Sequence, residues 1–309
     1  MIDYIKATII GVSYAELQTN QFLNCNGSYY LNREEVGSYL FGSYKGLKFK
    51  LYLPTEANPD GRILMDGSLH KFYNNGKHNH NDFGINQIQA VLEELKEKFN
   101  IRPENIILRN VEIGVNFSPP DNPQKILQYS LFHKKEMLKW HTVQNQGRYK
   151  VASYQNHYIK LYDKQWHSEK KGLNYFIDTL RFEIKYSKMR ALNEMGIATL
   201  QDLLDFGLIN FKPLLLKQWK NVLFYDYSIL DDTQYRQDYS NVNYWLELNC
   251  SNFKYHRNKL KRLLNEAPIN IKKLIGDAIG KKCDMLVQQT VQNTPLYIPI
   301  KRTDEVDAA

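Results

Sequence analysis

Apolar and polar residues alternate with a period of two along several segments in the first two thirds of the chain. Such alternation is typical of strands that bury one face in a core and leave the other face free. The predicted strands cover residues 3–14, 44–53, 62–73, 105–117, 126–139, 147–154, 157–163 and 178–186. We therefore expect a sheet to dominate this part of the fold.

Helical periodicity interrupts the strands at three places. Apolar residues from Ile85 to Phe99 form one stripe, which predicts a helix over residues 85–99 that stops before Pro103. A second helix is predicted over residues 187–195. Thr199 is in position to cap a third helix, which runs through residue 206.

Beyond about residue 208 the pattern becomes helical, with helices predicted over residues 211–224, 239–248, 252–264 and 269–287. The preceding region consists of two strand-rich stretches, each with a helix. We therefore predict an α+β fold with a mainly antiparallel sheet in two similar halves with packed helices, followed by a helical C-terminal domain. The predicted domains are an α+β body over residues 1–207 and a basic helical domain over residues 208–309.

Composition narrows the class of partner. The chain has 309 residues, 43% of them hydrophobic, and 41 Lys and Arg against 33 Asp and Glu give a net charge of +8. This balance favours a polyanionic partner, although many basic proteins bind no nucleic acid. Three scattered cysteines without metal-ligand spacing indicate a reducing cytoplasm. Because no stretch approaches about 18 uninterrupted apolar residues, we expect no membrane partner and a cytoplasmic location.

Two predicted strands carry reactive side chains on their polar faces. By alternation, the strand at 157–163 presents Tyr158, Lys160 and Tyr162. The strand at 178–186 presents Arg181, Glu183 and Lys185. A carboxylate, two tyrosines and three cations on one sheet surface would suit metal-assisted attack on a phosphodiester, with the cations holding the phosphate.

A third strand, at 105–117, presents Glu112 on its polar face. If this face adjoins that of residues 178–186, Glu112 and Glu183 form a two-carboxylate site. Mg²⁺ or Mn²⁺ takes such oxygen ligands, with water completing the shell. The alternative interpretation is a solvated sheet face with ordinary cross-strand ion pairs.

The same segments resemble a known family. Tyr162-Asp163-Lys164 followed downstream by Arg181-Phe182-Glu183 resembles the Y-[DN]-K … R-x-E signature of rolling-circle replication initiators, namely staphylococcal-type plasmid Rep (Rep_trans) and filamentous-phage gene II proteins. The segment 108–116 is similar to their R-[IL]-D-[IL]-A-x-D strand, with Glu112 and Asn116 in place of aspartates. Residues 67–74 and 79–83 also resemble phage-type initiators, so the resemblance spans roughly residues 60–205.

The resemblance implies a nuclease that breaks one DNA strand by tyrosine attack, leaving a 5′-phosphotyrosine and a free 3′-OH. It implies Glu112 and Glu183 as ligands of Mg²⁺ or Mn²⁺. Tyr162 is then the first choice of nucleophile and Tyr158 the second, because both lie on the polar face with Lys160. Tyr186 is expected on the apolar face of its strand, so it is a weaker candidate for the nucleophile.

His78-Asn79-His80 is similar to the paired histidines of HUH nucleases, although Asn79 is not apolar. We therefore keep two interpretations: a metal-ligand role for His80 or His78, and a polar loop. DNA contacts are expected at Arg181, Lys185 and Lys164.

The C-terminal region is strongly basic, since residues 251–282 carry nine Lys and Arg against two acids. In residues 257–264 the leucines are expected to face inward and the cations outward. Arg257 and Lys261 are therefore predicted to contact DNA phosphates in a salt-sensitive way. This region could position an origin duplex or mediate homodimerisation, and the sequence does not choose.

Together these features predict a site-specific single-strand endonuclease and strand transferase that initiates rolling-circle replication of a phage or plasmid. Its expected partners are origin DNA, single-stranded or supercoiled, and a host helicase or polymerase. Two alternatives stay open: a relaxase of a mobile element with the same chemistry, and a DNA-binding protein without catalysis whose carboxylates only pair with Arg181 or Lys185.

Overall fold

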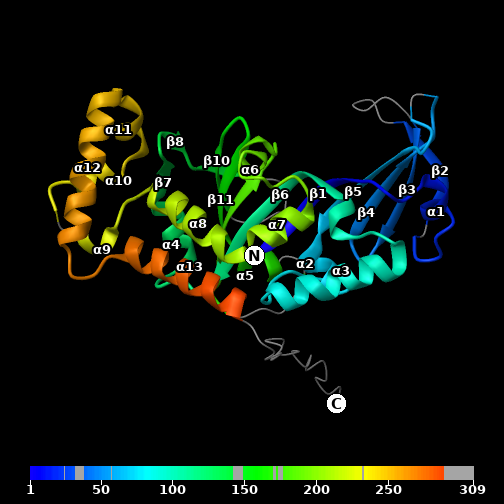
Figure 1. Cartoon of the computed structure of the whole chain (residues 1–309). Helices are drawn as coiled ribbons and strands as arrows, with labels where there is room; N and C mark the ends of the chain where they lie inside the picture. The colour runs from blue at the N-terminus through cyan, green and yellow to red at the C-terminus, as the bar shows by residue number, and fades with distance from the viewer. Residues whose placement is uncertain are drawn as a thin grey trace, which may run out of the picture.

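The fold is built on one long antiparallel sheet, seen in a computed structural model that describes residues 1–23, 25–31, 38–56, 58–141, 149–169, 172, 177–231 and 233–288 (Figure 1). Within these residues the sheet has ten strands in the order β2-β3-β4-β5-β1-β6-β12-β11-β10-β9. Their bounds are β1 Ile2–Ile9, β2 Asn26–Leu31, β3 Ser38–Tyr44, β4 Leu47–Tyr52, β5 Arg62–Ser68, β6 Ile106–Phe117, β9 Lys139–His141, β10 Tyr149–Ser153, β11 His157–Asp163 and β12 Leu180–Tyr186.

The sheet consists of two halves that meet at the β1–β6 pair. Outward from β1 lie β5, β4, β3 and β2, and outward from β6 lie β12, β11, β10 and β9. In both halves the first strand is central, the last strand is its neighbour, and the remaining strands follow in reverse order. The predicted fold class, with two similar halves, is confirmed.

Helices follow and cover these strands. Their bounds are α1 Tyr14–Gln18, α2 Leu69–Tyr73, α3 Ile85–Phe99, α4 Pro123–Tyr129, α5 Lys164–Glu169, α6 Arg190–Asn193, α7 Leu200–Phe206, α8 Phe211–Lys220, α9 Tyr227–Leu230, α10 Arg236–Ser240, α11 Val242–Glu247, α12 Cys250–Glu266 and α13 Ile271–Gln288, with short 3-10 turns at Pro103–Asn105 and Leu208–Asn210. The helix predicted at 85–99 is α3, and Thr199 caps α7 as expected, accepting a bond from the Asp202 amide. No described helix is long and apolar enough to cross a bilayer.

Two hydrophobic clusters hold the elements together. The larger one lies against the sheet and takes apolar side chains from α3, α8 and α13, including Ile88, Leu215 and Ile275. The smaller one includes Phe132, Leu223, Trp245 and Leu260, from β7 (Ser130–His133), β13 (Val222–Phe224), α11 and α12. Helices α8 and α13 therefore pack with the sheet, while α9 to α12 surround the second cluster (Figure 1). The boundary at 207/208 stays a prediction, and residues 289–309 lie outside the described part.

Several predicted strands and helices are divided in the structure, including the helix predicted at 239–248, which is split between α10 and α11. The strand predicted at 126–139 begins instead as α4, because Pro123 occupies the first turn and Asn122 caps it, accepting from the Gln124 amide at 2.9 Å. The strand predicted at 62–73 ends at Ser68, whose hydroxyl caps α2. The helix predicted at 211–224 ends at Lys220, and Val222–Phe224 forms β13.

That last change depends on tertiary pairing. Strand β13 pairs with β7 (Ser130–His133), which also pairs with β8 (Glu136–Met137) in a separate three-stranded sheet. An apolar run such as Val222–Phe224 fits either a helix or a buried strand, so its partner decides its conformation. Strands β2 and β3 were not among the predicted strands.

Candidate active site

Three neighbouring strands bring most of the predicted site residues onto one face of the sheet. The register of β11, β12 and β6 sets them in three cross-strand rows, Tyr158–Lys185–Glu112, Lys160–Glu183–Gly114 and Tyr162–Arg181–Asn116. The expected juxtaposition of Glu112 and Glu183 is therefore present.

The charged side chains of this face form a continuous network. The Lys160 ammonium lies 2.9 Å from Glu112 Oε1 and 2.9 Å from Glu183 Oε1, so it bridges the two carboxylates. Lys185 Nζ lies 3.0 Å from Glu112 Oε1, and Arg181 Nε donates to Glu183 Oε2 at 2.6 Å. We call these residues, Glu112, Lys160, Arg181, Glu183 and Lys185, together with Asp3 as a sixth, the sheet-face network.

The face is more enclosed than the alternation predicts. Arg181 and Glu183 are only 3% and 1% exposed, so the expectation of a free face at these positions is wrong. Asp3 of β1 closes one side, with its Oδ2 atom 3.4 Å from Arg181 Nη2 and accepting a bond from Asn79 Nδ2 at 2.7 Å. Ser68 also donates to Asp3. Because tertiary contacts cover this face, strand alternation alone could not reveal its burial.

The chain segment between α2 and α3 forms part of the cover. Asn79 accepts a bond from Lys164 Nζ at 2.7 Å, and the His80 carbonyl accepts one from Asn116 Nδ2 at 3.2 Å. Asp3 was not singled out from the sequence. The only signal available there was an acidic residue at the same parity as the apolar Ile5, Ala7 and Ile9 of the N-terminal strand.

Gly114 makes the close approach of β6 and β12 possible. A Cβ atom at this position would lie 2.4 Å from the Glu183 Cβ and 2.6 Å from the Phe182 carbonyl oxygen. Since real side chains do not approach so closely, only glycine permits Glu183 to sit directly across from β6.

Burial and charge act in opposite directions on the two glutamates. Burial disfavours the ionised form of Glu183, but Lys160 and Arg181 outweigh it and lower its pKa to about 2. The pKa of Glu112 is raised, because burial and the neighbouring Glu183 carboxylate outweigh Lys160 and Lys185. The two carboxylates likewise raise the pKa of Lys160, against the effect of burial. The network thus holds Glu183 and Lys160 in their charged forms.

The candidate tyrosines have distinct environments. Tyr162 is half-buried, and burial together with the Glu183 charge raises its pKa well above 10, against the effect of Arg181. Tyr158 is half-buried at the Lys185 end of the same face. Tyr186 is buried in the core on the opposite face, as its parity predicts, and burial raises its pKa to about 12.

A further tyrosine of this face was missed from the sequence. Tyr149 of β10 pairs in register with Tyr162, and their rings meet edge to face with centroids 6.4 Å apart. Its hydroxyl lies 2.6 Å from His141 Nδ1. A phenol in contact with an imidazole is a chemically competent arrangement for proton transfer.

His80 and Lys164 are both buried, at 4% and 1% exposure. The His80 ring stacks on His78 with centroids 3.9 Å apart, and burial followed by the neighbouring His78 lowers its pKa to about 4. Among the described residues, no group of three or more His, Cys, Asp or Glu side chains could hold a metal ion. The structure therefore does not bring His80 together with Glu112 and Glu183.

The two glutamates have the donor chemistry that a divalent ion requires. Their carboxylate oxygens converge on one point, and that point is held by the Lys160 ammonium. Glu112 and Glu183 would thus bind Mg²⁺ or Mn²⁺ together with water ligands, and the ion would compete with the Lys160 ammonium for their oxygens.

Arg257 and Lys261 lie elsewhere, on α12. Arg257 donates through Nη2 to the Asn221 carbonyl at 3.3 Å, and Lys261 is exposed. Both line a hollow between α12, α8 and α13 rather than the sheet-face network.

Comparison with solved structures gives a distant likeness, and the sequence comparisons give none. No family model matches the chain, and no curated protein matches it significantly. The fold is similar to the structure of a rolling circle replication initiator protein from Geobacillus stearothermophilus, with 13% sequence identity and a TM-score of 0.36 over 72% of this chain and 84% of that chain.

Proposed function

We propose that this chain is a site-specific DNA nicking and strand-joining enzyme that initiates rolling-circle replication of a phage or plasmid. The observation that supports it is the alignment of Tyr162, Lys160, Glu183 and Glu112 on one face of β11, β12 and β6. A phenol, a cation and two carboxylates on one face are the groups that such a reaction requires, and this supports the proposal. Origin DNA is the proposed partner, with a host helicase or polymerase and a second copy of the chain as further proposed partners.

In the proposed reaction the Tyr162 hydroxyl oxygen attacks the phosphorus of one phosphodiester. A bond forms between that oxygen and phosphorus, the bond from phosphorus to the 3′ oxygen breaks, and the 3′ oxygen leaves with a proton as a free hydroxyl. The DNA 5′ end stays attached as phosphotyrosine, and the reverse step rejoins it. Lys160 and Lys185 stabilise the charge that develops on the phosphate oxygens, while the buried Arg181 keeps Glu183 ionised.

The phenol must lose its proton during attack, because its raised pKa keeps it protonated at neutral pH. An ion bound at Glu112 and Glu183 would withdraw charge from the phosphate. Displacement of Lys160 from the carboxylates would also free its ammonium for the phosphate.

The test is incubation with supercoiled origin DNA, with and without Mn²⁺. Metal-dependent open circles carrying covalently attached protein support the proposal, and Tyr162→Phe should abolish them while leaving DNA binding intact. Tyr158→Phe should reduce nicking less than Tyr162→Phe, or affect only a second strand-transfer step. Peptide mapping of the adduct decides among the tyrosines, and attachment at Tyr149 or Tyr186 would contradict the choice of Tyr162.

Metal binding has a test of its own that does not need activity. Lys160→Met removes the ammonium that competes for the carboxylates, so Mn²⁺ should raise the Tm of this variant more than that of the wild type. The Lys160→Met/Glu112→Gln double variant serves as the control. Equal Tm shifts in all three proteins would exclude Glu112 and Glu183 as the metal site.

A second candidate function is DNA binding without catalysis. It is favoured by the pairing of each glutamate with a protein cation, Glu112 with Lys185 and Glu183 with Arg181. Supercoiled DNA that stays intact with Mn²⁺, together with tight and salt-sensitive binding, would select it.

A further inference from the structure

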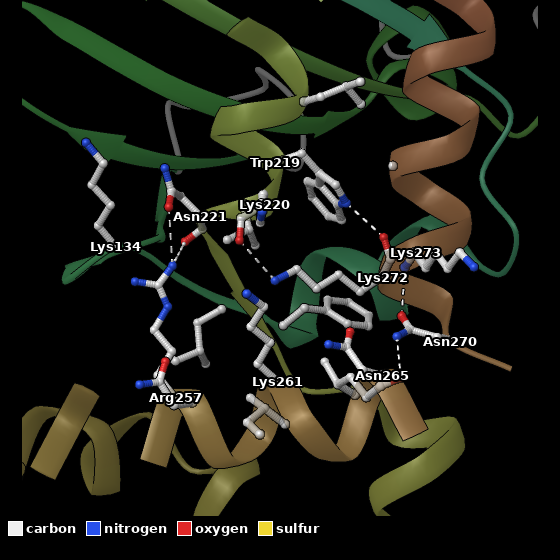
Figure 2. A pocket seen from close by; sticks show the side chains of 18 of the residues that line it. Lys134, Trp219, Lys220, Asn221, Arg257, Lys261, Asn265, Asn270, Lys272 and Lys273 are labelled. Carbon is white, nitrogen blue, oxygen red and sulfur yellow. Dashed lines mark hydrogen bonds between the residues drawn. The ribbon is translucent and has the colours of Figure 1, made fainter. Parts of the chain in front are cut away.

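The second large accumulation of charge lies away from the sheet-face network. A hollow of about 1350 Å³ opens between α12, α13, the end of α8 and the β7–β8 turn. Its described lining has ten Lys and Arg and two Asp, and the cations are Lys134, Lys135, Lys212, Lys220, Lys254, Arg257, Lys261, Lys272, Lys273 and Lys281. Figure 2 shows the labelled side chains of Lys220, Arg257, Lys261 and Lys272 around this hollow.

Four of these cations face one another across the hollow and define what we call the basic groove. Arg257 and Lys261 come from α12, Lys220 from the end of α8, and Lys272 from the first turn of α13 (Figure 2). None of the four is within ion-pair distance of a carboxylate in the described part of the chain. Of the two acids in the lining, Asp284 is already paired with Lys212 at 2.7 Å, and Asp277 is exposed, with no ion pair to any of the four in the described part of the chain.

This arrangement costs the folded protein free energy. Lys272 is half-buried, and its ammonium donates to the Lys220 carbonyl at 3.2 Å. Burial, followed by the charges of Arg257, Lys261 and Lys220, lowers its pKa to about 8. Binding of a polyanion would reduce the repulsion between these like charges in the partly desolvated hollow.

The shape of the groove restricts that polyanion. A bilayer is flat and a DNA duplex is a wide, stiff rod, so each would meet only the rim. A single nucleic-acid strand is thin and flexible enough to lie between walls that carry cations on both sides. Trp219 and Phe253 of the lining are buried, and the Trp219 Nε1 already donates to the Lys272 carbonyl at 2.9 Å, so neither ring is available for base stacking.

We infer that the basic groove binds a single strand of nucleic acid by its phosphodiester backbone, without reading its bases. The side-chain amides of Asn221 and Asn265 at the same lining add hydrogen-bonding groups for phosphate oxygens. This inference does not depend on nicking at the sheet-face network.

The test is fluorescence anisotropy of labelled oligo(dT) with the full chain, in EDTA, which prevents any metal-dependent nicking. Lys220→Glu/Lys261→Glu should weaken binding at least about tenfold and reduce the slope of log affinity against log salt by about 1.4. The matched control is Lys217→Glu/Arg262→Glu, with exposed cations of the same two helices that do not line the groove. Equal losses in both double variants would overturn the inference.

Two further ligands test the nature of the occupant. An abasic oligonucleotide of the same length should bind within about threefold of oligo(dT), because no ring stacks on bases. A duplex should lose less affinity than oligo(dT) in the Lys220→Glu/Lys261→Glu variant. Two results would contradict a site for the backbone of a single strand. One is a much higher affinity for oligo(dT) than for the abasic oligonucleotide, and the other is a loss of affinity in the variant for the duplex alone. Binding to the groove can persist when the nicking assay fails, and nicking can persist when binding to the groove is lost. The two proposals can therefore be tested separately.

Discussion

The sheet-face network and the basic groove both concentrate lysine and arginine, and they differ in what faces those cations. In the network, Asp3, Glu112 and Glu183 meet Lys160, Arg181 and Lys185, so three negative charges balance three positive ones. In the groove, the four cations face one another and carbonyl oxygens.

The difference separates charges that the fold satisfies from charges that it leaves for a ligand. Burying a balanced network costs desolvation free energy, but each charge recovers part of it through a partner. Unbalanced cations in a hollow recover only what carbonyl oxygens supply until an anion arrives. Removing a charge should therefore destabilise the network but stabilise the groove, and this contrast can be tested.

The largest effect is expected for Arg181→Met. It leaves the buried carboxylates of Asp3 and Glu183 without their shared guanidinium, and breaking a buried pair in this way costs about 3–5 kcal/mol of unfolding free energy. Denaturant titration measures it. Arg190→Met is the control, since Arg190 forms an exposed pair with Glu194 just beyond the end of α6, and this variant should lose less than about 0.5 kcal/mol. Comparable losses in both variants would mean that the network contributes no more than a surface ion pair.

A smaller effect, of about 3 kcal/mol, is expected from acid titration of Glu183. Its folded-state pKa of about 2 lies below the unfolded-state value of about 4.3, so its contribution is fully present above that value. The contribution is lost as the pH falls through 2. Stability measured in urea between pH 6 and pH 2 should thus decline more steeply for the wild type than for Glu183→Gln.

The exposed Glu104 provides the reference for this titration. Glu104→Gln should follow the wild-type decline. Identical slopes for Glu183→Gln and Glu104→Gln would show that the network does not hold Glu183 ionised.

Gly114→Ala tests whether backbone approach supports the network. The added methyl would overlap the Glu183 Cβ, and such overpacking costs about 1–3 kcal/mol. Gly280→Ala is the opposite case, because its Cβ would meet the Lys212 Cε at an ordinary 3.6 Å inside α13, at the wall of the groove. It should stabilise the protein by about 0.5–1 kcal/mol. Destabilisation by Gly280→Ala but not by Gly114→Ala, measured by thermal unfolding, would reverse our view of the two regions.

The smallest effect is expected for Lys261→Glu. Replacing one repelling cation should raise the pKa of Lys272. It should also raise the Tm by about 1–3 °C at low salt and weaken the binding of a single strand. Arg262→Glu, on the same helix but outside the groove, should leave the Lys272 pKa, the Tm and the binding nearly unchanged. A lower Tm for Lys261→Glu would indicate that Lys261 stabilises the fold instead of serving a ligand.

The sequence alone determined the elements with strong local signals. Helix α3, the cap of α7 at Thr199 and the alternation of β6, β11 and β12 were all readable, because periodicity and capping act over a few neighbouring residues. Alternation also placed Glu112, Lys160 and Glu183 on one side of their strands, and the register of the three strands brings them together as expected.

Tertiary structure decided everything that depends on distant partners. It turned Val222–Phe224 into a strand by pairing it with β7, buried Arg181 under Asp3, and set Lys160 between the two glutamates. It also folded α12 and α13 so that their cations converge on one hollow. The reason is that local propensity fixes the direction of a side chain along its own element, whereas burial, ion pairing and cavities arise only when elements far apart in the chain pack against each other.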